Sequence, residues 1–337
     1  MNVMHGTINV DVLRGKVDEE NEIWGHSGDD VLAGGKLDDA VIGGKGNDDL
    51  WGDRGDDKLI GDSGDDTLRG SVGDDRVYGG VGNDNLSGGK NDDTLAGGKD
   101  NDLLNGNSGD DALLGGSGDD VLMGTAGMDV LFGGRGNDKL SGGTGDDFLM
   151  ASSGNDTYVG GEGFDTLDFS RMKGVVELDL GKHWAKVGSG NAVATNELWG
   201  FEQIIGSDAG NRMMGSDSGS TTFVGGASAD WFRGKQGADT YTGGEGADTF
   251  AFLRKDTYDG SSDLITDFTV GEDRLDLADF MKGRASLDNA LRLGSNEAGD
   301  AVVQGLVKGS WVDVVTLAGV DAASTSLRDL GVDLLQG

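Results

Sequence analysis

The chain has 337 residues, and its 61 Asp and Glu residues outnumber 27 Lys and Arg, giving a formal net charge of −34. A surface of this sign repels nucleic acid phosphates and anionic lipid and attracts cations, so nucleic acid is excluded as a partner. The absence of cysteine excludes a disulfide framework and thiol chemistry.

Residues 1–24 are expected to form degenerate capping repeats, because solenoids need atypical terminal repeats. The segment GTINVDVLR (6–14) matches the later repeats loosely, with Asp11 and Leu13 in the usual places. The start, MNVMHGTINVDVLRG, has no basic region followed by an apolar run, so no Sec-type signal peptide is expected there.

Residues 25–168 repeat every nine residues without an insertion, as sixteen nonapeptides. Glycine occupies the first position except at Ala151, and the fourth except at Leu37, Asn91 and Asp100. The eighth position is always apolar and is leucine in thirteen repeats. A disordered glycine-rich linker would have this composition, but it would not keep an uninterrupted nine-residue spacing. The sixth position is always aspartate, at Asp30, Asp39, Asp48, Asp57, Asp66, Asp75, Asp84, Asp93, Asp102, Asp111, Asp120, Asp129, Asp138, Asp147, Asp156 and Asp165.

The repeat predicts an all-β fold, a parallel β-roll solenoid. Positions seven to nine predict a short strand whose side chains alternate outward, inward and outward. The glycines of positions one to six supply the positive φ angles that a tight chain reversal needs. One strand and one turn make half a coil, so eighteen residues form a full rung, and alternate repeats belong to opposite sheets.

The aspartates predict calcium sites in the turns. Burying one apolar side chain per repeat contributes ~1.5–3 kcal/mol, whereas ordering the backbone costs ~1–2 kcal/mol for each residue, so burial alone does not hold the roll. Sixth-position aspartates of repeats i and i+2 face each other across adjacent rungs, where like charges repel. Ca²⁺, which binds carboxylate and carbonyl oxygens in flexible turns, reverses this repulsion better than Mg²⁺. Sixteen repeats predict about fourteen such sites.

Residues 169–205 leave the nine-residue register and predict an irregular β insertion. Within it, VVELDL (175–180) and LWGFEQII (198–205) alternate like strands. We expect this insertion to pack onto the end of the roll rather than to form a separate binding site.

Residues 206–251 predict a second, shorter β-roll, because the repeats resume there in a looser form. Asn211 and Ser220 stand where aspartate is expected. The next three repeats restore the aspartate and add three candidate metal ligands, Asp230, Asp239 and Asp248.

Residues 252–337 are expected to form a C-terminal cap and to carry a sorting signal. The segments AVVQGL (301–306) and WVDVVTL (311–317) predict two strands that close the structure. The last residues, SLRDLGVDLLQG (326–337), combine acidic and apolar side chains.

The nonapeptide G-G-x-G-x-D-x-U-x, in which U is apolar, is the repeat of RTX (repeats-in-toxin) calcium-binding proteins, and the chain resembles this family over most of its length. The resemblance implies a β-roll with Ca²⁺ in its turns. It also implies secretion through a type I apparatus with an uncleaved C-terminal signal, and therefore an extracellular location. Residues 261–280 resemble the cap that follows the roll in serralysin-type metalloproteases. In length the chain is similar to calcium-binding proteins exported in nodulation signalling.

Three departures from the family pattern affect particular turns. Leu37 does not easily adopt the glycine conformation, so we expect weak or missing calcium between its turn and that of Gly55. Asn91 and Asp100 tolerate left-handed geometry better.

The sequence contains no catalytic motif: no H-E-x-x-H, G-x-S-x-G or Walker A sequence occurs. We therefore expect a secreted, non-enzymatic calcium-binding protein that acts in surface adhesion or in interaction with a host or the environment. Two alternatives remain open. One is an accessory or cryptic polysaccharide-active or hydrolytic enzyme module, and the other is a cation-conducting protein that inserts into membranes.

The ninth position of the even repeats predicts an apolar stripe on one outer face of the roll. The corresponding position of the odd repeats is mixed. Another part of the chain would cover this stripe, or it would bind a cell-surface, polysaccharide or membrane partner. The stripe consists of Ile42, Ile60, Tyr78, Ala96, Leu114, Phe132 and Met150.

Overall fold

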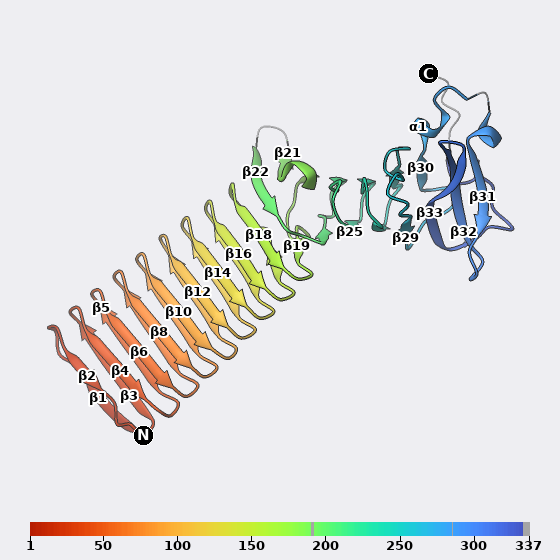
Figure 1. The fold of residues 1–337 in the computed structure, drawn as a ribbon. Helices are drawn as coiled ribbons and strands as arrows, with labels where there is room; N and C mark the ends of the chain where they lie inside the picture. Colours follow the sequence, from red (N-terminus) through yellow and green to blue (C-terminus); the bar gives the residue numbers. More distant parts are fainter. Residues whose placement is uncertain (190–191, 285, 333–337) are drawn as a thin grey trace. The chain divides into compact units, whose positions relative to one another are not determined.

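The computed structural model describes residues 1–189, 192–284 and 286–332 (Figure 1). It contains two compact units. The first comprises Met1–Leu167 with Asn196–Phe201, and the second comprises Asp168–Thr195 with Glu202–Gly337.

The first unit is a solenoid of parallel strands in two sheets, which confirms the predicted all-β roll. In each sheet a strand pairs with the strand eighteen residues later over most of the roll, as Leu95 of one strand does with Leu113 of the next. One sheet contains β1 (Asn2–His5), β3 (Asn21–Ser27), β5 (Ala40–Lys45), β7 (Lys58–Ser63), β9 (Arg76–Val81), β11 (Thr94–Lys99), β13 (Ala112–Ser117), β15 (Val130–Arg135) and β17 (Phe148–Met150).

The other sheet of this unit is formed by the alternate strands. They are β2 (Val12–Arg14), β4 (Val31–Gly35), β6 (Asp49–Arg54), β8 (Thr67–Val72), β10 (Asn85–Lys90), β12 (Leu103–Ser108), β14 (Val121–Ala126), β16 (Lys139–Thr144) and β18 (Thr157–Glu162). The end of β22 (Ala192–Trp199) then pairs with β18. Strand β19 (Thr166–Asp168) follows β18 in the chain.

Most strands are longer than the three residues that the pattern predicts. A typical strand has six residues and continues through the first three positions of the next repeat, as β6 does. The second position takes a positive φ inside the strand, at 76° for Asp53 and 94° for Thr125. Because most repeats have this kink at the same place, with Gly35 and Ser152 as exceptions, neighbouring strands stay in register through it.

The core of the roll is the ladder of eighth-position side chains, as predicted. Leu50, Leu59, Leu68 and Val77 are completely buried, and Tyr158 near the end of the main array is too. One side chain per repeat fills the space between the two sheets, so the turns must be held by other interactions.

The second unit begins with an antiparallel pair inside the insertion. Strand β20 (Val175–Asp179) pairs with β21 (Trp184–Ser189), and the turn η1 (Leu180–Lys182) joins them. Strand β20 also pairs in parallel with β24 (Arg212–Met214), so the insertion starts one sheet of the second array.

The second array has the same two-sheet arrangement with an aromatic core. One sheet is formed by β23 (Gln203–Ile205), β25 (Thr222–Gly226), β27 (Thr240–Gly244) and β29 (Asp263–Ile265). The other continues from β24 to β26 (Trp231–Arg233), β28 (Thr249–Ala251) and β30 (Arg274–Asp276). Phe223, Phe232, Tyr241 and Phe250 stand where the main roll has leucine, and all are buried.

The C-terminal segment forms the predicted closing strands. Strand β31 (Leu291–Ser295) pairs antiparallel with β32 (Asp300–Val307), and β32 with β33 (Ser310–Asp321). Strand β33 also pairs with β29, which joins this segment to the second array. The short helix α1 (Ala278–Met281) and the turn η2 (Leu287–Asn289) precede these strands. Of the predicted sorting signal, residues 333–337 lie outside the described residues.

The helices of this fold are short. Across the described parts of the chain, none has the length and apolar character needed to cross a membrane.

Candidate metal centres in the turns

The sixth-position aspartates form a ladder of hydrogen bonds along each edge of the main roll. Asp48 accepts the backbone N–H of Asp30 on Oδ1 at 2.7 Å, and Asp120 accepts that of Asp102 at 2.9 Å. The same bond links each pair of aspartates eighteen residues apart through to Asp165. One carboxylate oxygen therefore holds the turn of the preceding rung in place.

The second oxygen of most of these carboxylates is buried and has no hydrogen-bond partner among the described residues. An unpartnered buried carboxylate oxygen is costly unless a cation or a donor reaches it. The Oδ2 atoms concerned belong to Asp30, Asp39, Asp48, Asp57, Asp66, Asp75, Asp84, Asp93, Asp102, Asp111, Asp120, Asp129, Asp138 and Asp147.

The first-position glycine provides the space for this oxygen. A Cβ atom placed on Gly115 would lie 2.5 Å from Asp120 Oδ2 and 2.6 Å from the carbonyl oxygen of Gly133. Both distances are too short for a real side chain, so only glycine fits. A carboxylate oxygen and a carbonyl oxygen from the next rung thus approach the same point, and these are the oxygen types that bind Ca²⁺.

Burial changes the protonation of the ladder. It raises the pKa of Asp57 and of Asp93 to about 8, with a further contribution from the facing carboxylates of the neighbouring rungs. It raises the pKa of Asp48 to about 6. In each case the accepted backbone hydrogen bond opposes the shift. The metal-free turns therefore disfavour the charged carboxylates that a cation would stabilise.

A metal ion in these turns needs more ligands than the side chains of the described residues supply. Within the described residues there is no group of three or more His, Cys, Asp or Glu side chains able to hold a metal ion. A cation in these turns must therefore take backbone carbonyls as further ligands. That requirement fits Ca²⁺, which takes six to eight oxygen ligands, better than Zn²⁺, whose sites are mostly four-coordinate and built largely from Cys and His.

A second ladder, at the fifth position, was not predicted. Its bonds run in the opposite direction: Asp29 accepts the backbone N–H of Asn47 at 2.8 Å, and Asn47 accepts that of Asp65 at 2.9 Å. The signal was present, because this position is Asp or Asn in every repeat except at Met128 and Phe164. Those two side chains are 57 % and 48 % exposed.

The fourth position behaves as the sequence predicts. Asn91 and Asp100 adopt the left-handed conformation, with φ of 77° and 72°. Leu37 does not, because a branched side chain is strained there. The turn of Asp39 therefore differs in backbone shape from the regular turns.

The three candidate ligands of the second array also join a ladder. Asp248 accepts the backbone N–H of Asp230 at 2.8 Å, and Asp239 accepts that of Thr221 at 2.7 Å. The Oδ2 atoms of Asp239 and Asp248 are buried without a partner among the described residues. Asp230 differs, because its Oδ2 accepts the N–H of Gly226 at 2.9 Å.

Two more aspartates extend this ladder beyond the repeats. Asp263 accepts the backbone N–H of Asp239, and Asp273 accepts that of Asp248, each at 2.9 Å. They were missed because their separations are 24 and 25 residues instead of eighteen. Burial raises the pKa of Asp263 to about 8, again with a contribution from the neighbouring Asp239.

One expectation for the second array was wrong. Asn211 stands in the ladder as predicted and donates its N–H to Asp230. Ser220 does not, because Thr221 takes that place and Ser220 instead accepts the N–H of Ala238 at 2.9 Å. Ten residues separate Asn211 from Thr221, so a strict count of nine identifies the wrong residue.

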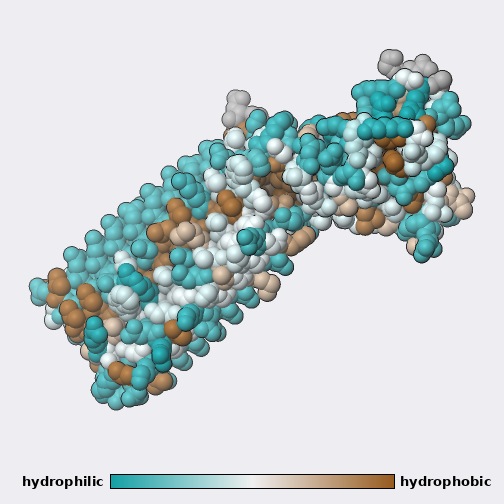
Figure 2. Space-filling model, in the orientation of Figure 1, coloured by the Kyte–Doolittle hydropathy of each residue, from teal (hydrophilic) through white to brown (hydrophobic). Residues whose placement is uncertain are grey.

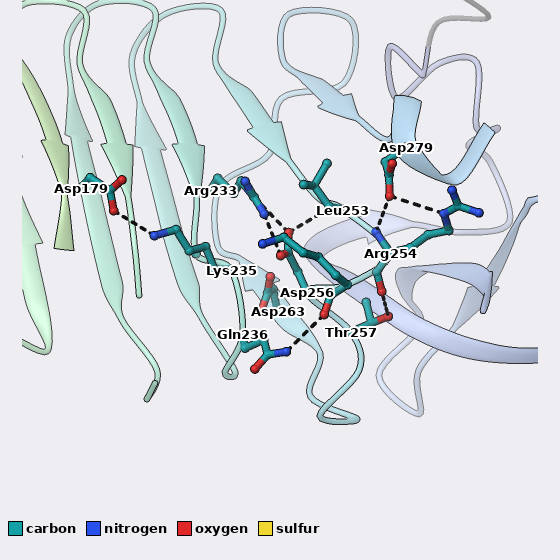
Figure 3. A network of polar contacts seen from close by, with 12 residues as sticks. Asp179, Arg233, Lys235, Gln236, Leu253, Arg254, Asp256, Thr257, Asp263 and Asp279 are labelled. Atoms are coloured by element: carbon teal, nitrogen blue, oxygen red, sulfur yellow. Dashed lines mark hydrogen bonds and ion pairs between the residues drawn. The ribbon is translucent and has the colours of Figure 1, made fainter. Parts of the chain in front are cut away.

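Protein cations neutralise other carboxylates in the second unit (Figure 3). Lys235 Nζ lies 2.8 Å from Asp179 Oδ1, and both side chains are largely buried, at 11 % and 4 % exposure. Arg233 makes a two-pronged contact with Asp256, at 2.8 and 3.0 Å. These carboxylates already have counter-charges and do not need a metal ion.

The predicted apolar stripe forms a continuous row on one sheet. Its residues are direct partners in adjacent strands, from Ile42 and Ile60 through Leu114 and Phe132. Leu114 is 44 % exposed, whereas Ile42 is buried. Figure 2 shows apolar patches among hydrophilic residues on the face of the roll that it presents.

Comparison with known proteins identifies the repeats. A family model described as RTX calcium-binding nonapeptide repeat (4 copies) matches residues 24–59, 51–86, 60–95, 87–122, 114–149, 123–158, 132–167 and 215–250. These segments cover 24–167 and 215–250, more than half of the chain, and include no catalytic domain. No curated protein matches the chain.

Proposed function

Because this chain belongs to the RTX calcium-binding nonapeptide repeat family, we propose that it is a secreted protein that binds Ca²⁺ in its turns and folds as it does so outside the cell. Proteins of this family are typically exported by type I secretion. Extracellular calcium modules bind at ~10⁻⁴–10⁻³ M, so the roll stays unfolded in a low-calcium cytosol.

The observation that carries this proposal is the row of unpartnered Oδ2 atoms. Each is buried beside a first-position glycine, and at several of these glycines, such as Gly115, a carbonyl oxygen of the next rung lies near the same point. Without a cation, these carboxylates lose their hydration and repel one another. With Ca²⁺, the binding free energy becomes folding free energy, because the site does not exist in the unfolded chain.

We further propose that the roll acts without catalysis, in adhesion or interaction with a host or the environment. The apolar stripe supplies the contact surface, and exposed Lys58 and Arg76 lie beside Ile60 and Tyr78 on the same strands. An exposed apolar row of this kind suits contact with a cell-surface, polysaccharide or membrane partner.

Circular dichroism of the full chain, titrated with Ca²⁺, tests calcium-dependent folding. We expect a cooperative gain of β signal that Mg²⁺ reproduces much less well. Equal β content in a calcium chelator would overturn the proposal. Exposure to a protease in parallel should show protection at the same calcium concentration.

Secretion is tested separately by deleting residues 326–337. The truncated chain should remain inside cells that carry a type I apparatus, while the full chain is exported. Leu330 is buried and its carbonyl accepts the N–H of Leu275, so the truncated chain must first be shown to fold in Ca²⁺. Normal export of the truncated chain would place the signal elsewhere.

A further inference from the structure

The turn of Asp156 differs from the regular turns of the roll in the partners of its carboxylate. Asp156 Oδ1 keeps the ladder bond and accepts the N–H of Asp138 at 2.9 Å. Its Oδ2, unlike those of the regular turns, is hydrogen-bonded: the hydroxyl group of Tyr158 donates to it at 2.8 Å, and that of Ser152 does so at 3.4 Å.

The Tyr158 hydroxyl group links two parts of this turn. It accepts the backbone N–H of Ser152 at 3.0 Å while it donates to Asp156. The tyrosine stands at the eighth position, where thirteen repeats have leucine, and its ring is completely buried in the core ladder. The leucine of the regular repeats has no polar atom with which to make either contact.

The same repeat lacks the first-position glycine. Ala151 is the single exception among the sixteen repeats, and it is buried. In the regular repeats the free Oδ2 lies where a first-position Cβ would be, as at Gly115. The Cβ of Ala151 therefore takes the space in which the metal-facing oxygen lies elsewhere, and Asp156 Oδ2 turns to Tyr158 instead.

The residue that follows Asp156 in the ladder along this edge is uncharged. Asp156 donates its N–H to Asn196 Oδ1 at 2.8 Å, so an amide from the insertion replaces the aspartate of the following rung. Asn196 is completely buried. Beyond Asp156 the ladder therefore continues with an uncharged residue, and the carboxylate that faces Asp156 from a neighbouring rung is that of Asp138.

We propose that the turn of Asp156 is closed to metal and that the Tyr158 hydroxyl group takes the place that Ca²⁺ has in the regular turns. The inference rests on the proposed calcium binding of those turns. It assigns to Ala151 and Tyr158 together a role in cation selection: the methyl group blocks the site, and the hydroxyl group satisfies the carboxylate. This edge of the roll accordingly ends in a turn that is held without a cation.

A second tyrosine at the eighth position makes a related contact in the second array. Tyr241 accepts the N–H of Gly234 at 2.8 Å and donates to Asp263 Oδ2 at 3.3 Å. Here the first-position residue is still glycine, and Asp239 Oδ2 keeps its unpartnered state among the described residues. The comparison shows that a tyrosine alone leaves a free oxygen in its own repeat, so the alanine is needed for closure.

The test is the number of calcium ions bound per chain at saturation, from equilibrium dialysis with elemental analysis and from native mass spectrometry. The variant Ala151→Gly with Tyr158→Leu converts the repeat to G-S-S-G-N-D-T-L-V and should bind one more ion than the unmodified chain. Tyr158→Phe, which keeps Ala151, should bind no extra ion but should lower the Tm in saturating Ca²⁺ by several degrees, because Asp156 loses a donor.

The reverse exchange provides the matched control. Gly142→Ala with Leu149→Tyr places the same pair in the preceding repeat and should lose one ion. Should that variant fail to fold, the gain of an ion by Ala151→Gly with Tyr158→Leu still decides the question. An unchanged count in that variant would overturn this inference and leave the proposed function intact. Failure of the unmodified chain to bind Ca²⁺ would overturn both.

Discussion

Asp57 accepts the backbone N–H of Asp39 on Oδ1 at 2.7 Å, across one rung of the roll, while its Oδ2 is buried without a partner among the described residues. The same carboxylate thus ties two turns together through one oxygen and offers the other for a cation. Removal of such a side chain has two effects, because the preceding turn loses an acceptor and the cation loses a ligand.

A low pH should stabilise the fold in part even when calcium is absent. The pKa of Asp57 in the folded chain is about 8 and that of Asp48 about 6, against 3.8 for an ordinary aspartate. A raised carboxyl pKa means that protonation stabilises the metal-free fold, so its stability increases as the pH falls from about 8 towards 3.8. We expect more β signal in calcium-free buffer at pH 5 than at pH 8, measured by circular dichroism.

A lower pH should weaken calcium binding to the folded ladder, although it stabilises the metal-free fold. Because the ion binds the charged carboxylates, protons compete with it below about pH 8, and binding releases protons. At pH 5.5, where acid has already folded part of the chain, Ca²⁺ binding should therefore release protons into a weakly buffered solution, whereas at pH 8, where the unfolded chain has charged carboxylates, it should release few. The absence of proton release at pH 5.5 would show that the ladder carboxylates are already charged in the metal-free fold.

Substitutions in regular and irregular turns should differ in effect. Asp120→Ala removes a ligand from a regular turn and should raise the calcium midpoint more than Asp39→Ala, because the Asp39 turn contains Leu37 outside the left-handed region. Leu37→Gly should lower the midpoint. Calcium titrations of the three variants, followed by circular dichroism, check the order, and equal midpoints for the two alanine variants would contradict it.

The apolar stripe should tolerate charge when it is not covered by the chain. Leu114 is 44 % exposed, so Leu114→Lys with Phe132→Lys should leave the Tm in saturating Ca²⁺ nearly unchanged but abolish association or surface binding. Ser87→Lys with Asn105→Lys on the opposite sheet is the matched control. Thermal unfolding and sedimentation of both variants separate the cases, and a large loss of stability would show that the stripe is buried.

The Lys235–Asp179 ion pair should matter more than its exposed neighbour. Although burial alone would raise it, the pKa of Asp179 is lowered by hydrogen bonds from Lys235 and Lys182. Lys235→Met leaves a buried carboxylate with only the exposed Lys182 and should cost about 3 kcal/mol. Lys182→Met should cost less than about 1 kcal/mol. Urea unfolding of the calcium form distinguishes them, and equal costs would contradict the burial argument.

The strict nine-residue period made most of the main roll predictable. It predicted the inward leucines, the sixth-position ladder and the distinct turn at Leu37, because each depends on position within one repeat. The fifth-position ladder was missed because both Asp and Asn occur there, so a search for a position that is always aspartate does not find it. Asp263 and Asp273 were missed because longer loops precede them, and only the folded chain shows which aspartate after such a loop joins the ladder.

The closed turn of Asp156 required three-dimensional information. Ala151 and Tyr158 are both visible in the sequence as exceptions, but each alone is a conservative change. Their joint effect depends on the hydroxyl group reaching Asp156 through the core, which the one-dimensional pattern does not describe.

The alternation of strands between two sheets also constrains how such a gene can change in length. A deletion of nine residues between β5 and β18 would move every later strand to the opposite sheet. Removal of residues 97–105, for example, would set Leu114 beside Ser87 instead of Ala96 and would divide the stripe between the two faces. A deletion of eighteen residues removes one complete rung and restores every pairing on both sides of the cut. Tandem copying in units of 54 nucleotides is therefore the mutation that this fold accepts, and length differences among descendants of the gene should be multiples of that unit.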